Sequence, residues 1–269
     1  MATVISFEIQ KGGTGKTTST SSLGECLGQK GYKVLLIDMD PQGNLTYSCG
    51  AYDSISEHKT SYDLLKAEYN HTLEYTLESL SEYILQTPND CHFDLIPTNI
   101  LLAGAEYEFT DLSRSHLLKN SIEPLQSFYD FILLDCPPSL GILTTNAFVA
   151  SNDLIIPIEP SSFALQGMEQ LKRSIDNVKK YSNNSDLEVS VLITRTQKRR
   201  NVVDYVIDDI VEKSSYYGYP VFDTKISECI AVKECQSMQQ PLLQFDPNCT
   251  ASIQYKQLCE EYLSKKGGK

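Results

Sequence analysis

The fold is decided by a stretch near the start of the chain, Lys11-Gly12-Gly13-Thr14-Gly15-Lys16-Thr17-Thr18. The apolar run before it, Thr3–Ile9, predicts a strand, and the segment after it, Thr17–Gln29, has helical spacing. A glycine-rich loop between a strand and a helix N-terminus is the setting in which backbone N–H groups surround phosphate oxygens. The general Walker A pattern needs a glycine where this chain has Gln10, so the loop is a variant of that pattern.

The residue types in this loop predict contacts with a bound nucleotide. Glycines permit positive φ and a close approach of the backbone to phosphate. We expect Lys16 to contact the β and γ phosphates and the Thr17 hydroxyl to bind Mg²⁺. The alternative is an ordinary glycine-rich turn. This interpretation is weaker, because six positions match the motif in the right context. The predicted nucleotide-binding residues are Lys11, Gly12, Gly13, Thr14, Gly15, Lys16, Thr17 and Thr18.

Two further motifs are apolar runs that end in carboxylate residues. Val34–Asn44 is a buried strand that carries Asp38 and Asp40 to its carboxyl end, the edge at which ligand sites of α/β sheets form. Phe131–Gly141 has the form of a Walker B strand, and its Asp135 is expected to hold a Mg²⁺-bound water. Taken alone, these acids could be turn residues or simple strand ends. Their order after the phosphate loop favours the functional interpretation.

Together the three motifs resemble those of the ParA/MinD family of deviant Walker A ATPases, and most closely the short ParA and Soj type of partition ATPase. The resemblance implies ATP and Mg²⁺ as cofactors, with slow hydrolysis that a partner stimulates. It implies that Lys11 reaches across a nucleotide-sandwich homodimer to the phosphates of the other subunit, and that Asp40 orients the attacking water. The implied catalytic residues are Lys11, Lys16 and Asp40, and the implied metal-binding residues are Thr17, Asp38 and Asp135.

The remaining pattern predicts one α/β domain, a P-loop NTPase with a mostly parallel central sheet flanked by helices on both faces. We expect the domain to cover residues 1–264 and residues 265–269 to form a flexible tail. Further strands are predicted at Lys33–Ile37, Phe93–Ile96, Asp130–Leu134, Asp153–Ile158, Leu187–Ile193 and Tyr219–Phe222. Further helices are predicted at Ser61–Glu68, Ser113–Ser127, Leu140–Ala150, Ser162–Lys180, Val202–Ser214, Cys229–Ser237 and Thr250–Leu263.

Composition limits the partners and the compartment. The 269 residues carry a formal net charge of -12, so the molecule as a whole repels nucleic acid and acidic membranes. Contact with DNA must therefore come from a local basic patch. The eight cysteines include no CxxC pair, and we expect structural thiols rather than a metal or redox site. No apolar leader or membrane-spanning stretch is apparent, which favours the cytoplasm.

The scaffold of the family serves three classes of function, so the function depends on the sites. The basic patch predicted to bind DNA non-specifically is Lys198, Arg199 and Arg200, although a solvated loop is the alternative. Glu228 and Ser227 stand where relatives often carry an arginine and a proline. We expect a partition ATPase that binds DNA and a ParB-like centromere-binding protein, associating with the nucleoid when ATP-bound. The main alternatives are positioning of a non-DNA cargo or a regulatory role. MinD-like membrane positioning and electron transfer fit the sequence less well.

Overall fold

The computed structural model describes residues 1–87, 89–109, 112–161, 163–182, 184–197 and 201–267, without the side chains of residues 112, 113 and 201–203. Within this part of the chain, a seven-stranded sheet has the order β3-β4-β2-β5-β1-β6-β7. All neighbouring strands run parallel except the β3–β4 pair. The fold class is therefore the predicted α/β class. The strands are β1 (Thr3–Phe7), β2 (Val34–Asp38), β3 (Leu85–Gln86), β4 (Asp94–Ile96), β5 (Phe131–Asp135), β6 (Asp153–Ile158) and β7 (Glu188–Ile193).

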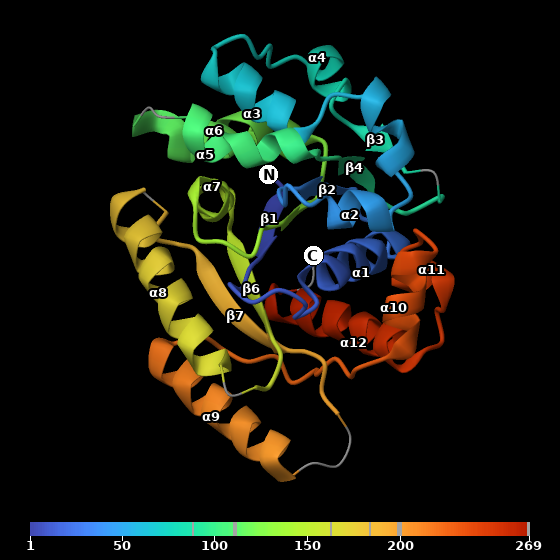
Figure 1. The fold of residues 1–269 in the computed structure, drawn as a ribbon, viewed down its shortest axis with the longest axis vertical. Helices are drawn as coiled ribbons and strands as arrows, with labels where there is room; N and C mark the ends of the chain where they lie inside the picture. Colours follow the sequence, from blue (N-terminus) through green and yellow to red (C-terminus); the bar gives the residue numbers. More distant parts are fainter. Residues whose placement is uncertain (88, 110–111, 162, 183, 198–200, 268–269) are drawn as a thin grey trace.

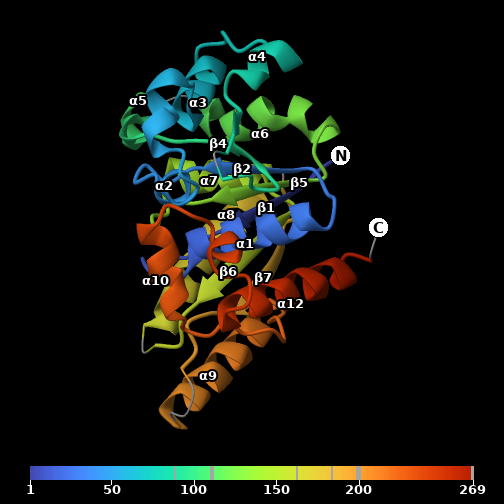
Figure 2. The same cartoon turned by 90° about the vertical axis from the view of Figure 1, so that its right-hand side faces the viewer.

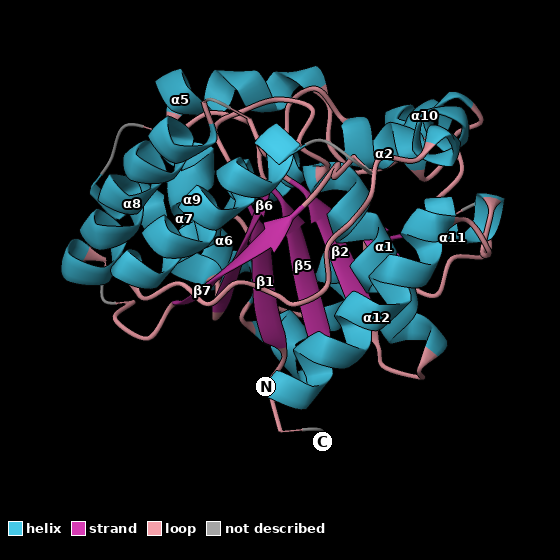
Figure 3. Ribbon diagram, turned by 90° about the horizontal axis from the view of Figure 1, so that it is seen from below, coloured by secondary structure: helices cyan, strands magenta, loops and turns pink. Residues whose placement is uncertain are grey.

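The central strands are apolar along their length because helices cover both faces of the sheet. Every residue of β2 and β5 is buried. Their register pairs Asp38 with Asp135, and the register of β1 with β5 pairs Phe7 with Asp135. The loops that follow β1, β2 and β5 therefore begin side by side at one edge of the sheet. Both chain termini lie at the opposite end of the strands (Figure 3).

Helices form a layer on each face of the sheet (Figures 1 and 2). One layer contains α1 (Lys16–Gln29), α2 (Asn44–Ser48), α10 (Ile230–Ser237), α11 (Leu242–Phe245) and α12 (Thr250–Lys265). The other contains α3 (Ser61–Tyr69), α4 (Leu77–Ser81), α5 (Ala105–Glu108), α6 (Leu117–Ile122), α7 (Ile142–Ala150), α8 (Ala164–Tyr181) and α9 (Asn201–Tyr217). Short 3₁₀ helices occupy Tyr52–Glu57, Ile100–Gly104, Leu112–His116 and Pro124–Ser127.

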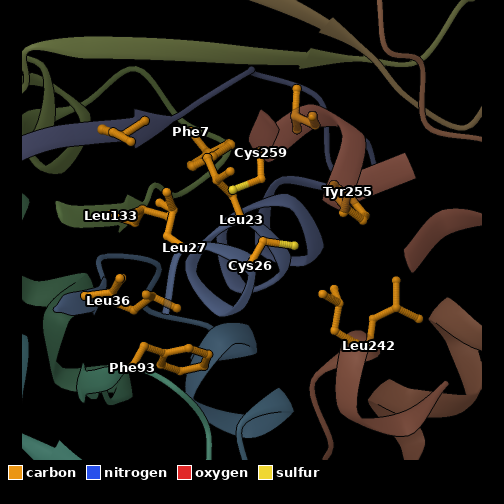
Figure 4. Close-up of a cluster of buried hydrophobic side chains, with 14 of the residues drawn as sticks. Phe7, Leu23, Cys26, Leu27, Leu36, Phe93, Leu133, Leu242, Tyr255 and Cys259 are labelled. Atoms are coloured by element: carbon orange, nitrogen blue, oxygen red, sulfur yellow. The ribbon is translucent and has the colours of Figure 1, made fainter. Parts of the chain in front are cut away.

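The core under α1 joins the first and last helices of the chain to the sheet (Figure 4). Leu23 and Leu27 of α1 are fully buried, as are Leu36 of β2 and Leu133 of β5. The ring of Tyr255 in α12 closes the other side, and its hydroxyl lies 2.9 Å from the Ser19 Oγ of α1. Helix α1, which follows the phosphate loop, is thus fixed from both sides.

Several sequence predictions differ from the structure. Tyr219–Phe222 is not a strand of the sheet, because it makes only the single bridge Val191↔Val221. The two-residue β3 was not predicted, and the helix predicted at Ser113–Ser127 is three short pieces with a break before Pro124.

The predicted domain end at residue 264 and the flexible tail after it stay a prediction. Helix α12 ends at Lys265, and the Lys266 ammonium lies 2.6 Å from Asp153 Oδ1 and 2.7 Å from Glu188 Oε2.

Candidate functional site

The phosphate loop connects β1 to α1 at the carboxyl edge of the sheet, as its motif predicts. Gly15 has a φ of 91°, a left-handed conformation in which a side chain would be strained. A Cβ built on Gly15 would meet no atom within 4 Å, so the loop backbone is open to a ligand on that side. The Thr194 hydroxyl, just after β7, donates to the Thr14 carbonyl over 2.7 Å and anchors the loop. The open backbone and the helix N-terminus behind it fit a nucleotide phosphate.

Lys16 is the first residue of α1 and is buried below the loop. Its Nζ donates to the Ile9 carbonyl over 3.3 Å. The ammonium lies close enough to the Glu8, Asp40 and Asp135 carboxyls to favour their charged forms. The structure therefore brings the predicted phosphate lysine together with two of the predicted acids.

Thr17 and Asp135 form the pair that the two Walker motifs predict. The Thr17 hydroxyl donates to Asp135 Oδ2 over 2.7 Å, and the Thr20 hydroxyl lies 3.4 Å from Oδ1. Burial raises the pKa of Asp135 to about 7, although the Thr17 bond and the Lys16 charge oppose this rise. A hydroxyl and a carboxylate at this distance are oxygen donors of the kind that Mg²⁺ prefers.

Asp38 and Asp40 play different parts in the structure. Asp38 is fully buried, and its oxygens accept from the Thr46 N–H, the Thr46 hydroxyl and the Asp40 N–H. It fixes the loop after β2, and its place near the Mg²⁺ shell stays a prediction. Asp40 lies nearer the surface, where its Oδ1 accepts from the Gln42 N–H over 3.0 Å. Burial raises the pKa of Asp40, although this hydrogen bond and the Lys16 charge oppose the rise, so its carboxylate is more basic than that of an exposed aspartate.

The structure adds a carboxyl that the motifs did not single out. Glu8 directly follows β1 and is completely buried, and within the described chain neither of its oxygens has a hydrogen-bond partner. Burial raises the pKa of Glu8 well above its usual value, the Lys16 charge lowers it, and Asp135 and Asp40 raise it further. The available signal was that Glu8 is the one charged residue in the strand-like run Thr3–Ile9.

Lys11 turns toward its own chain. Its Nζ lies 2.6 Å from Glu159 Oε2 and 3.5 Å from the Ser161 hydroxyl, on the segment after β6. Arg195 lies at the same rim, where its Nη1 donates to the Gly13 carbonyl over 2.9 Å. Neither Glu159 nor Arg195 was predicted as a residue of the nucleotide site.

A pocket of about 420 Å³ extends from the phosphate loop toward α10. Its lining includes the loop and Asp40 together with Val232 and Gln236 of α10. The volume suits a small ligand. The segment from Ile226 to Cys229 also lines the pocket.

The predicted DNA-binding residues Lys198, Arg199 and Arg200 lie outside the described residues. Arg195, at the start of that basic run, faces the phosphate loop and pairs with Glu228, where Arg195 Nη2 and Glu228 Oε1 are 3.3 Å apart. Among the described residues, no helix is long and apolar enough to cross a membrane. The apolar side of the C-terminal helix α12, including Tyr255 and Leu258, is buried in the core with α1.

Comparison with known proteins gives consistent results. A family model described as "AAA domain" matches residues 2–189. The chain is 35% identical to the sporulation initiation inhibitor protein Soj of Bacillus subtilis over 97% of this chain and 98% of that protein. It is 34% identical to the chromosome-partitioning ATPase Soj of Treponema pallidum over 99% of both. The crystal structure of cobyrinic acid a,c-diamide synthase from Mycobacterium smegmatis, with a bound ATP analogue and magnesium, superposes with a TM-score of 0.82, at 29% identity over 100% of this chain and 98% of that one.

Proposed function

Since the chain belongs to the ParA/MinD family of deviant Walker A ATPases, we propose that it is a partition ATPase that closes into a sandwich dimer on Mg-ATP. In the proposed cycle the ATP-bound dimer binds DNA non-specifically, and a ParB-like partner stimulates hydrolysis. The observation that carries the proposal is the pair of lysines on one loop. Lys16 is buried among the carboxyls at the sheet edge, whereas Lys11 is at the rim with 41% of its side chain exposed.

The two positions suit two different tasks. Lys16 and the loop N–H groups face a phosphate bound by the same protomer, and Lys16 offsets its negative charge. Lys11 stands at the mouth, from which a long side chain can reach phosphates held by a second copy. Bound Mg-ATP supplies the terminal phosphate whose transfer to water ends the closed state.

The chain's own carboxylates carry the remaining roles. Thr17 and Asp135 hold the metal and one of its waters through their oxygens, a role that the contact between the two side chains supports. Asp40 orients a water toward the terminal phosphate, and its raised pKa improves it as a proton acceptor. The part of the pocket lining that α10 contributes, including the partly buried Val232, offers apolar surface for the base.

A regulatory role is the second candidate. The Bacillus subtilis relative is named an inhibitor of sporulation initiation, so one scaffold of this type carries a regulatory name. Both candidates use the same nucleotide switch. They differ in what the closed dimer binds, and DNA binding therefore separates them.

We expect Lys16→Ala to weaken ATP binding by at least about tenfold, because a hydrogen bond to a charged phosphate contributes roughly 1.5–3 kcal/mol. Lys11→Ala should keep ATP binding and lose ATP-dependent dimerisation. Lys30→Ala, an exposed lysine at the end of α1 paired with Glu260, is the control and should keep both properties. Calorimetric titration measures ATP affinity, and light scattering measures the dimer. Normal ATP-induced dimers of Lys11→Ala would contradict the proposed dimer.

A further inference from the structure

Charged side chains form an alternating row along the rim of the nucleotide pocket. The row runs from Lys11 on the phosphate loop to Glu159 after β6, then to Arg195 after β7 and Glu228 before α10. The two oxygens of Glu159 face different cations. Oε2 lies 2.6 Å from Lys11 Nζ, and Oε1 lies 3.6 Å from Arg195 Nη1.

Further contacts fix the far side of this row. Arg195 has a φ of 53°, an uncommon conformation for a residue with a side chain, and its Nη1 is held by the Gly13 carbonyl over 2.9 Å. Glu228 Oε2 also accepts from Gln197 Nε2 over 2.8 Å. Glu159 therefore sits in a rigid frame, and only 24% of its side chain is exposed.

The position of Lys11 conflicts with its proposed task. An ammonium 2.6 Å from a carboxylate of its own chain is held toward its own protomer, and extending it to phosphates in another subunit draws it away from that carboxylate. We propose that Glu159 is a positioning residue that holds Lys11 within its own protomer, and that this ion pair must open in both copies before the dimer closes. The inference rests on the proposed function, because it takes Lys11 to act across the dimer.

The size of the effect follows from the exposure of the pair. Ion pairs between partly exposed groups contribute about 0.2–1 kcal/mol, which corresponds to roughly 1.4- to 5-fold in an equilibrium constant. A dimer opens two such pairs, so the effects multiply to about 2- to 30-fold. Glu159 thus sets how much ATP and protein the switch requires without preventing closure.

The test compares Glu159→Gln, which keeps the shape and removes the charge, with the unchanged protein. In the nucleotide-free state, mass spectrometry measures how fast an amine-acylating reagent modifies Lys11. A lysine freed from its carboxylate should react faster. With ATP, light scattering should give a dimer dissociation constant about 2- to 30-fold lower. Glu228→Gln is the matched control: it removes a carboxylate from the same row that lies beyond Arg195, and it should leave Lys11 reactivity unchanged.

The outcomes separate this inference from the proposed function. If unchanged protein dimerises with ATP but Glu159→Gln alters neither Lys11 reactivity nor the dissociation constant, the positioning role of Glu159 is overturned. If Lys11 reactivity rises in Glu159→Gln but no protein dimerises with ATP, the ion pair stands while its release step and the proposed dimer both fail. Faster modification together with tighter ATP-dependent dimers supports the inference.

Discussion

Among single residues, Glu8 has the least ordinary environment. A carboxyl that is completely buried loses its hydration, and within the described chain no hydrogen bond replaces it. The Lys16 ammonium compensates in part, but Asp40 and Asp135 add negative charge nearby. Burial therefore dominates and raises the pKa of Glu8, so the folded protein holds this proton more tightly than the unfolded chain does.

The sign of the pH effect follows from this raised pKa. The stability that Glu8 contributes is fully present below its unfolded value near 4.5 and is lost as the pH rises through the higher folded value. Glu8→Gln removes this loss. We expect the melting temperature of nucleotide-free Glu8→Gln to exceed that of the unchanged protein by a margin that grows from pH 5.5 to pH 8.5. Scanning calorimetry across that range measures the margin.

The raised pKa values of Asp38, Asp40 and Asp135 contribute to the pH dependence of both proteins, so the margin reports Glu8 together with its coupling to Asp40 and Asp135. If the melting temperatures of the two proteins instead change in parallel with pH, Glu8 binds its proton equally in the folded and unfolded states. That result would assign the buried carboxyl a purely structural role.

At the scale of elements, α1 depends on how closely it approaches its neighbours. The helix is rich in small residues, and the Ser21 hydroxyl in its second turn donates to the Thr17 carbonyl over 3.0 Å. Near its end, a Cβ on Gly28 would lie 1.9 Å from the carbonyl oxygen of His92. Backbone meets backbone here, so the chain cannot relieve the clash by moving a side chain.

We therefore expect Gly28→Ala to lower the free energy of unfolding by about 1–3 kcal/mol, because overpacking displaces α1 from the segment before β4. Gly167→Ala in α8 is the matched control. A Cβ there would meet only Ile9 carbons at 3.9 and 4.0 Å, which is ordinary contact. The control should be neutral or more stable by up to roughly 1 kcal/mol, since alanine favours helix more than glycine. Urea denaturation measures both, and equal stabilities of the two variants would contradict the close approach.

For the whole molecule, the net charge of -12 governs encounters with DNA. Long-range repulsion opposes binding by one protomer with a small basic patch. Pairing of two protomers puts two copies of the patch on one body and roughly doubles its phosphate contacts. DNA binding should therefore depend steeply on ATP and on salt.

We expect triple alanine substitution of Lys198, Arg199 and Arg200 to weaken ATP-dependent DNA binding similarly for unrelated sequences and to flatten its salt dependence. Each lost phosphate contact should lower the slope of log affinity against log salt by about 0.9. Triple alanine substitution of Arg173, Lys179 and Lys180 on α8 removes the same charge elsewhere and should change the slope less. Fluorescence anisotropy with labelled DNA at several salt concentrations measures the slopes. If the ATP-bound dimer has no DNA affinity at low salt, the regulatory or non-DNA role becomes the better proposal.

The sequence of local segments determined the central strands and the position of the phosphate loop. Apolar runs predicted β1, β2 and β5, because strands buried on both faces need continuous hydrophobicity, and the runs of β2 and β5 end in carboxylates. The loop from Lys11 to Thr18 predicted where a nucleotide site would form, since glycine spacing and the strand-to-helix context are both local properties. The structure brings Lys16, Thr17 and Asp135 together at the edge that this reasoning indicates.

Tertiary structure alone decided the contacts between distant segments. Tyr219–Phe222 has the composition of a strand, yet only Val221 bridges to β7. Strand pairing depends on where the tertiary fold positions a segment relative to the sheet. Glu159 meets Lys11 across 148 positions of sequence, and no local pattern encodes that distance. The isolation of Glu8 likewise arises only when helices cover the sheet. Residue spacing specifies a loop and a strand, whereas the pairing of charges depends on the folded arrangement of several elements at one edge.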